Sequence, residues 1–167
     1  MRIAEVAAGQ GFIHVATLPR HPPRTQIPAR RADRGAAPGG IICLLSALRV
    51  HDIGTQAPHE VWLALDRKAR KPAHPPARIR IVRFSGAMLS YGILTCQILG
   101  VPVRLTSPAR TVVDCLRYRG KLGLDVALEA MREAIRSRIA TADEIIRAAD
   151  VCRARTVVST YLETLAS

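Results

Sequence analysis

The chain has 167 residues, of which 49% are apolar, and its formal net charge is +12. This length allows one domain with a hydrophobic core, and the apolar content excludes a chain that is disordered throughout. A protein this basic is often drawn to polyanions such as nucleic acids. Lysine occurs only at Lys68, Lys71 and Lys121, so the charge comes mainly from arginine, and a coding bias towards arginine is the alternative explanation.

Residues 1–38 are expected to form an irregular, mobile segment. A short possible helix (Ile3–Ala8) and strand (Phe12–Ala16) precede a stretch that is rich in proline and arginine and has no apolar periodicity. Each proline removes an amide donor and biases the residue before it away from helix. We interpret this segment as a solvated linker rather than an arm that grips phosphates, and we place the folded domain at residues 39–167.

The next stretch, GGIICLLSALRVHDIG, is predicted to be a mostly buried helix. It is apolar at Ile41, Leu44, Leu45 and Leu48, and apolar nearly all round in its first turns. Gly54 is expected to end it, because glycine readily adopts the backbone conformation that closes a helix.

Two strands and a hairpin are predicted to follow. The segments HEVWLALD and IRIVRF alternate as half-buried strands do, and a basic, proline-rich loop separates them. The segment ILTCQILGVPVRLT has two apolar-rich runs that flank Leu99-Gly100, a turn signal for a hairpin. Pro102 indicates that its strand begins at a sheet edge or at a bulge.

The last third of the chain is predicted to be helical. Ser107 can serve as an N-cap with Pro108 at the first helical position, and Thr141 with Glu144 matches a capping box. Between them, an apolar stripe is expected to face the core. The stripe consists of Leu124, Leu128, Met131 and Ile135. The patterns together predict an α+β fold with a buried helix, a small, mostly antiparallel sheet with a hairpin, and a C-terminal group of three or four helices.

The four cysteines are widely spaced and show no zinc-ligand spacing. Cys43, Cys115 and Cys152 lie in apolar helical patterns, which predicts buried free thiols and fits a reducing compartment. No apolar run could span a bilayer and no signal-peptide core is present, so we expect a soluble, cytoplasmic protein without a membrane partner. The chain also lacks a glycine-rich phosphate loop, and we expect no cofactor and no metal.

A metal-assisted nuclease is the enzymatic alternative. Asp66 and Lys68 form an acid-x-Lys pair at the end of a predicted strand, and Glu60 or Asp114 would complete the metal site. Such cleavage needs clustered carboxylates that hold a divalent ion near the attacking water. Acidic residues are sparse between residues 41 and 100, so the leading prediction contains no catalytic residue.

Asp114 can pair with Arg110 or Arg117, which lie four residues before it and three residues after it on one helical face. An arginine can donate two hydrogen bonds to a carboxylate, and such a pair would orient the helix that starts at Ser107 and Pro108. We therefore expect a structural rather than a chemical role for this set.

Two basic clusters in predicted loops are the candidate nucleic-acid contacts. They consist of Arg67, Lys68, Arg70 and Lys71 between the strands, and of Arg117, Arg119 and Lys121 between two helices. Charges in exposed connections are available to phosphates, although solvated loops are the alternative. Any DNA binding is expected to be weak, largely independent of sequence and steeply reduced by salt.

Four segments resemble the C-terminal region of AbiEi-type antitoxins, the transcriptional-regulator partners in bacterial type IV toxin–antitoxin systems. They are GGIICLLSALRVHDI, APHEVWLALDRKARKP, IRIVRFSG and GVPVRLTSPARTVVDCLRYRGKLGLDVALEAMREAI. The resemblance runs from about Gly39 to the C-terminus. It implies an α+β C-terminal region, repression of the protein's own operon and a functional link to a nucleotidyltransferase-like toxin encoded next to it. It implies no catalytic residue.

Members of this family usually carry an N-terminal winged helix-turn-helix that binds promoter DNA. Residues 1–40 are too short and too rich in proline to supply one, so we expect this chain to lack the DNA-reading module. A non-enzymatic regulatory protein is the leading prediction. A nuclease-like enzyme and a truncated, inactive family fragment are the alternatives.

Overall fold

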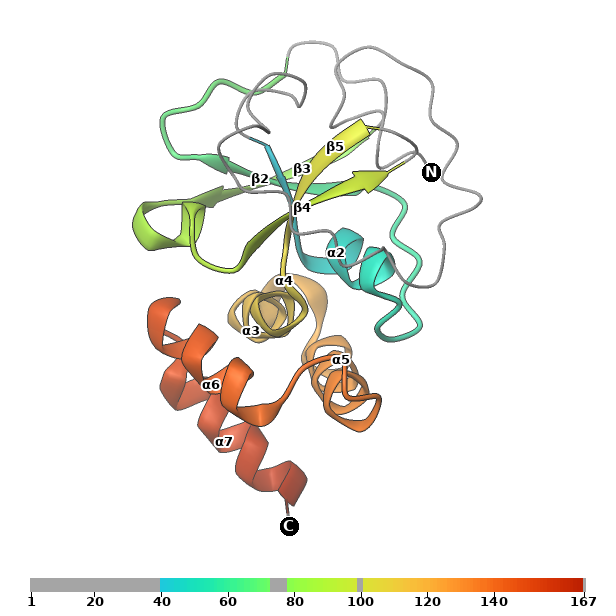
Figure 1. Ribbon diagram of the computed structural model, residues 1–167, viewed down its shortest axis with the longest axis vertical. Helices are drawn as coiled ribbons and strands as arrows, with labels where there is room; N and C mark the ends of the chain where they lie inside the picture. The colour runs from blue at the N-terminus through green and yellow to red at the C-terminus, as the bar shows by residue number, and fades with distance from the viewer. Residues whose placement is uncertain (1–39, 73–77, 99–100, 167) are drawn as a thin grey trace.

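The computed structural model describes residues 40–72, 78–98 and 101–166, and it confirms an α+β fold (Figure 1). The strands are β1 (Ile41–Ile42), β2 (Val61–Asp66), β3 (Ile79–Phe84), β4 (Ile93–Ile98) and β5 (Val101–Thr106). The helices are α2 (Leu44–His51), the 3₁₀ turn η3 (Gly86–Leu89), α3 (Pro108–Arg117), α4 (Arg119–Leu122), α5 (Leu124–Arg136), α6 (Ala142–Val151) and α7 (Arg155–Ala166). The predictions for residues 1–38 and for the turn at Leu99-Gly100 lie outside the described residues.

The sheet is mixed, which corrects the expectation of a mostly antiparallel one. Its five strands have the order β3-β2-β1-β5-β4. The pairs β1–β2 and β4–β5 are antiparallel, whereas β1–β5 and β2–β3 are parallel. The hairpin of β4 and β5 is confirmed. The alternation of side chains along a strand is the same in both directions, so the sequence pattern carried no information on strand direction.

The start of the predicted buried helix is instead the central strand of the sheet. Ile41 pairs with Ala64 of β2, and Ile42 pairs with both Leu63 of β2 and Leu105 of β5. Both isoleucines are completely buried, because a central strand is covered on both faces. A short apolar run of this kind suits a buried strand and a buried helix equally well.

The helix that follows, α2, also ends earlier than predicted. Its last turn closes at Asp52, which adopts a left-handed conformation with φ 57°, two residues before Gly54. Asp tolerates this conformation better than most residues, because its short polar side chain can bond to the local backbone.

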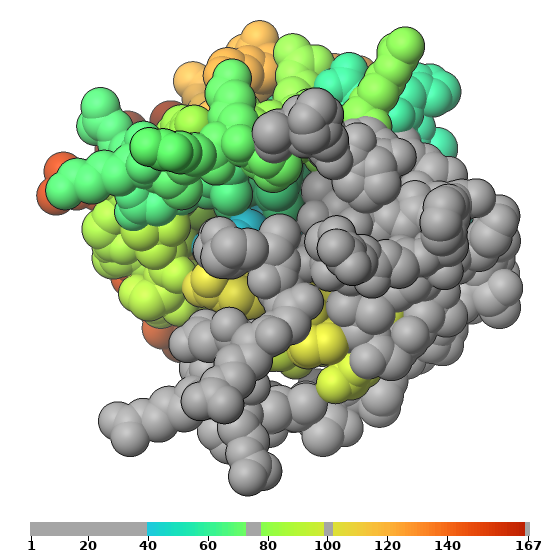
Figure 2. Space-filling model, turned by 90° about the horizontal axis from the view of Figure 1, so that it is seen from above, coloured from blue at the N-terminus to red at the C-terminus, as the bar shows by residue number. Residues whose placement is uncertain are grey.

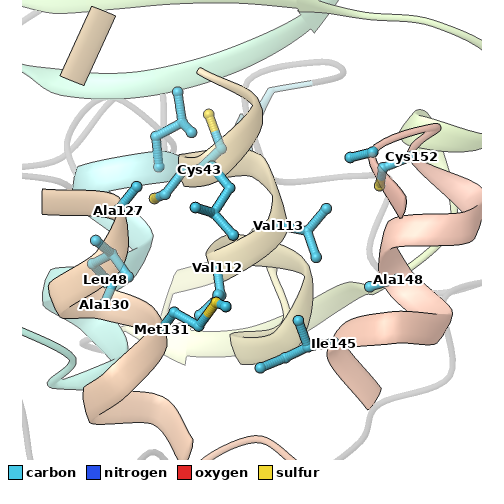
Figure 3. Close-up of a cluster of buried hydrophobic side chains, with 14 of the residues drawn as sticks. Cys43, Leu48, Val112, Val113, Ala127, Ala130, Met131, Ile145, Ala148 and Cys152 are labelled. Carbon is cyan, nitrogen blue, oxygen red and sulfur yellow. The ribbon is translucent and has the colours of Figure 1, made fainter. Parts of the chain in front are cut away.

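All the helices after β5 lie on one face of the sheet, with α3 nearest to it (Figure 1). Trp62, Val82 and Phe84 of the sheet share one core with Val112 and Leu116 of α3. Figure 3 shows Val112 and Val113 of α3 between α5 on one side and α6 on the other. Every residue of α3 from Arg110 to Leu116 is buried, so α3 is the central packing element of the domain.

The buried face of α5 differs from the predicted stripe. Of that stripe only Met131 is buried, while Leu128 and Ile135 are partly buried and Leu124 is 40% exposed. The face that packs on α3 is made of smaller side chains: Val126, Ala127, Ala130 and Ala134 with Met131. Alanine lets two helix backbones approach closely, so the larger leucines lie on the flanks of this contact.

The helix starts agree with the sequence. The Ser107 hydroxyl accepts a hydrogen bond from the Arg110 amide with Pro108 in the first turn, and Thr141 and Glu144 form the predicted capping box. Five helices follow the sheet rather than three or four, because the single turn α4 is separate from α3. In the described ranges, none of the helices has the length and apolar character that crossing a membrane requires.

Candidate nucleic-acid interface

The loop after β2 carries the first basic cluster on a tight turn. The Asp66 carboxylate accepts a hydrogen bond from the Lys68 amide at 2.7 Å, and the Asp66 carbonyl accepts one from the Ala69 amide at 3.1 Å. Asp66 therefore shapes the turn, as aspartate commonly does two residues before a bonded amide. The four cations of this loop, Arg67, Lys68, Arg70 and Lys71, are exposed. Figure 2 shows side chains of the green part of the chain, which includes this loop, projecting from the surface.

Arg83 of β3 holds this loop against the sheet. One of its guanidinium nitrogens donates to the carbonyls of Asp66 at 2.7 Å and Ala69 at 2.8 Å. Arg83 is opposite Leu65 in the parallel pair β2–β3, which brings its side chain to the end of β2. The sequence reasoning did not select Arg83. It shares one face of β3 with Ile79 and Ile81, and an arginine on an otherwise apolar strand face is unusual.

The three cations of the second basic cluster make different contacts. Arg117 donates to the Cys152 carbonyl at 3.0 Å and so joins α3 to the end of α6. Arg119 donates to the Leu116 carbonyl of the preceding turn at 3.0 Å. The exposed Lys121 ammonium lies over the Tyr118 ring, 5.7 Å from its centre. The contact of Lys121 uses none of its hydrogen-bond donors, whereas Arg117 and Arg119 each spend one guanidinium nitrogen on a backbone carbonyl and keep their others.

The predicted inter-helix loop is instead the end of α3 followed by the helix α4, and it meets the same edge strand, β3, as the loop after β2. The Tyr118 hydroxyl donates to the Arg83 carbonyl at 3.5 Å, while the Arg83 side chain holds the loop after β2. Exposed Arg80 of β3 adds a further cation, stacked 4.8 Å from the centre of the Trp62 ring. We call six of the exposed cations near this strand the basic edge: Arg67, Lys68, Arg70, Lys71, Arg80 and Lys121.

Arg110 and Asp114 form a completely buried ion pair behind this edge. Arg110 Nε donates to Asp114 Oδ2 at 2.9 Å, so Arg110 and not Arg117 is the partner. The same guanidinium donates to the carbonyls of Tyr91 at 2.8 Å and Met88 at 3.3 Å. The Arg110 side chain thereby fixes the segment between β3 and β4 to α3.

Asp114 is incompletely satisfied. Among the described atoms its Oδ1 is buried and has no hydrogen-bond partner. Burial raises the pKa of Asp114 to about 6, although the neighbouring Arg110 charge lowers it. Burial therefore disfavours the charged form of Asp114, as expected for a structural carboxylate that has no access to solvent.

The carboxylates of the nuclease alternative do not come together. Glu60 immediately precedes β2 and Asp66 is its last residue, so a strand of about 20 Å separates them. Asp114 is enclosed in its pair with Arg110. No group of three or more potential metal ligands occurs in the part of the chain that the structure describes. The nuclease site predicted from these residues is therefore not assembled.

The thiols are free, and three of them lie in the core. Cys43, Cys115 and Cys152 are buried as predicted, whereas Cys96 of β4 is half-buried. Burial raises the pKa of Cys115 far above its ordinary value and that of Cys152 to about 11. A nucleophilic cysteine needs the opposite environment, one that stabilises the thiolate.

A groove of about 790 Å³ lies away from these residues, between α5 and the turn after α2. It is lined by acidic and basic side chains together, among them Glu129, which accepts hydrogen bonds from the Thr55 amide and hydroxyl. None of the residues predicted from the sequence to bind nucleic acid lines this groove.

No protein-family model matches this chain, and a search of curated proteins finds no match.

Proposed function

We propose that this chain is a non-enzymatic regulatory protein that binds nucleic acid through the basic edge. The observation that carries the proposal is that cations from two distant parts of the sequence surround one edge strand. The sequence resemblance to AbiEi-type antitoxins supports a regulatory role in the cytoplasm, linked to a nucleotidyltransferase-like toxin. An edge strand also carries charge simply to prevent pairing with other chains, and this is the competing explanation.

The electrostatic state of the basic edge supports phosphate binding. The ion pairs found among the described residues join Arg110 to Asp114, Arg136 to Glu133 and Arg155 to Asp150. None of these pairs includes a member of the basic edge. Among the described residues, Arg80 and Lys121 lie over aromatic rings and no carboxylate is paired with the six cations, so a phosphate would not have to displace one.

Binding to a DNA duplex of arbitrary sequence should therefore depend on these charges. Replacing Arg67, Lys68, Arg70 and Lys71 together with glutamine is expected to weaken binding and to reduce the slope of log K against log salt by about 2 to 4, since each phosphate contact contributes about 0.9. Fluorescence anisotropy across a salt series measures both quantities.

The matched control removes the same charge elsewhere. Arg132, Arg138, Arg147 and Arg153 are exposed on α5, α6 and the turns that follow them, and their replacement with glutamine should change the salt slope much less. Equal losses in the two variants would mean that net charge alone attracts DNA. A sequence-specific footprint that resists salt would contradict the proposed mode of binding.

Antitoxin activity is tested separately from DNA binding. Expressing the chain together with a nucleotidyltransferase-like toxin encoded beside it should restore growth of cells that the toxin inhibits. The control is the Asp114→Ala variant, which is expected to fold poorly and therefore to rescue less. If the well-folded wild-type chain does not restore growth, the inactive-fragment alternative replaces the antitoxin proposal.

A further inference from the structure

Arg83 connects the basic loop after β2 to the edge strand β3. Its Nη1 atom donates to the Asp66 carbonyl at 2.7 Å and to the Ala69 carbonyl at 2.8 Å. These two carbonyls flank Arg67 and Lys68 in the sequence, so Arg83 holds the part of the turn that carries both exposed cations. Hydrogen bonds from a charged donor are stronger than those between neutral groups, and these two therefore fix the turn to β3.

The surroundings of Arg83 favour a role in holding the loop rather than in touching a ligand. Its side chain is half-buried, on the face of β3 that also carries Ile79 and Ile81. The Nη1 nitrogen has two hydrogens, and the two carbonyls accept both. The four loop cations are exposed by contrast, so they present the charge that a phosphate would meet first.

A charged residue at this place is not explained by stability alone. Arg83 holds a loop that has four further cations, and none of the ion pairs among the described residues includes it. Like charges that lie close together repel one another, so a neutral donor would hold the same carbonyls at a lower electrostatic cost. A cation here raises the positive potential of the loop, which suits a surface that attracts a polyanion.

We propose that Arg83 is the positioning residue of the basic edge: it presets the loop cations for phosphate and does not contact phosphate itself. This inference rests on the proposed function. A loop that is already ordered loses less conformational freedom when it binds, so preorganisation raises affinity without adding a contact. Arg83 therefore controls how tightly nucleic acid is bound, whereas the loop cations determine how many phosphates are neutralised.

Replacing Arg83 with methionine keeps most of the apolar stem and removes both hydrogen bonds to the loop. The affinity for a DNA duplex of arbitrary sequence is expected to fall about five- to tenfold, because the loop must be ordered on binding. The slope of log K against log salt should change by less than about 0.5, whereas loss of a phosphate contact would lower it by about 0.9. An unchanged affinity, or a slope reduced by a full contact, would overturn the proposal.

Arg104 provides the matched control. It is a half-buried arginine on β5, and its Nη2 atom donates to the Leu89 carbonyl at 3.2 Å. Arg104→Met removes the same charge and a contact of the same kind, but not a contact with the loop after β2, so it should change the affinity much less. Equal losses in the two variants would assign the effect to net charge or general stability and would contradict the positioning role.

A double-mutant cycle tests whether Arg83 acts through the loop. In the variant in which Arg67, Lys68, Arg70 and Lys71 are replaced with glutamine, Arg83→Met should cause little further loss of affinity, because the cations that it positions are absent. Residues that act through one another show such non-additive effects. Fully additive losses would mean that Arg83 acts elsewhere, and the proposal would be wrong.

Amide hydrogen exchange measures the order of the loop without nucleic acid. In Arg83→Met the Lys68 and Ala69 amides, which donate within the turn, should exchange several-fold faster, while the amides of β2 keep their rates. Unchanged exchange in the loop would refute the positioning role. A wild-type chain that binds no duplex would overturn the proposed function and this inference with it, whereas wild-type binding that Arg83→Met leaves intact would overturn this inference alone.

Discussion

Replacing Asp114 with alanine is expected to lower the free energy of unfolding by about 3–5 kcal/mol, the loss seen when one partner of a buried ion pair is removed. The Arg110 guanidinium would remain fully buried, and its Nε would have lost its 2.9 Å hydrogen bond to Asp114 Oδ2. The contacts of the guanidinium with the Tyr91 and Met88 carbonyls would then be the main compensation for its charge. Chemical denaturation monitored by the single tryptophan, Trp62, measures the change.

Asp114→Asn is the matched control for this prediction. The amide keeps an oxygen that can accept from Arg110 Nε, while it loses the negative charge and places an NH2 group at the position of the unpartnered Oδ1. Because burial raises the pKa of Asp114 to about 6, that charge is held in an unfavourable environment. We therefore expect a smaller loss, about 1–2 kcal/mol. An Asp114→Ala variant with unchanged stability but lost DNA binding or rescue would show that Asp114 acts in function rather than in folding.

Replacing Gly92 with alanine is expected to destabilise the fold by about 2–4 kcal/mol, as the sum of backbone strain and overpacking. Gly92 has φ 62°, a conformation that residues with a Cβ rarely adopt. A Cβ there would also lie 3.0 Å from Arg110 Cβ and 3.2 Å from the Ser107 hydroxyl oxygen. The methyl group would thus push on the helix start that positions the buried ion pair.

Gly86 provides the control that separates the two contributions. It has a similar φ of 56°, but a Cβ there would meet no atom within 4 Å. Gly86→Ala should therefore show the strain alone, about 1–2 kcal/mol. Thermal or chemical unfolding of both variants measures the difference. Equal losses of stability in the two variants would mean that the contact of the new methyl group with Arg110 and Ser107 costs nothing, which would contradict the close packing of Gly92 against the start of α3.

Several elements were predictable from the sequence because they depend on neighbours along the chain. Ser107 and Pro108 start α3, and Thr141 with Glu144 starts α6, because a helix cap needs only the backbone of the next three residues. The alternating strands β2 and β3 and the hairpin of β4 and β5 were predicted for the same reason.

Other elements depended on partners that are far away in the sequence. Ile41 and Ile42 form a strand rather than a helix because β2 and β5 take up their backbone hydrogen bonds. The directions of β2 and β3 follow from the path of the connecting chain, which side-chain alternation does not record. On α5, the close approach of α3 selected alanines rather than leucines for the buried face.

The candidate interface divides in the same way. The sequence by itself determined which segments are basic, and Arg67, Lys68, Arg70, Lys71 and Lys121 are exposed in the folded chain. Only the tertiary structure decided that the loop after β2 and the junction of α3 and α4 meet one edge strand, that Arg83 holds the loop, and that Arg117 ties α3 to α6. Charge is a property of the local sequence, whereas the convergence of charges and the choice of Arg110 over Arg117 depend on packing between distant segments.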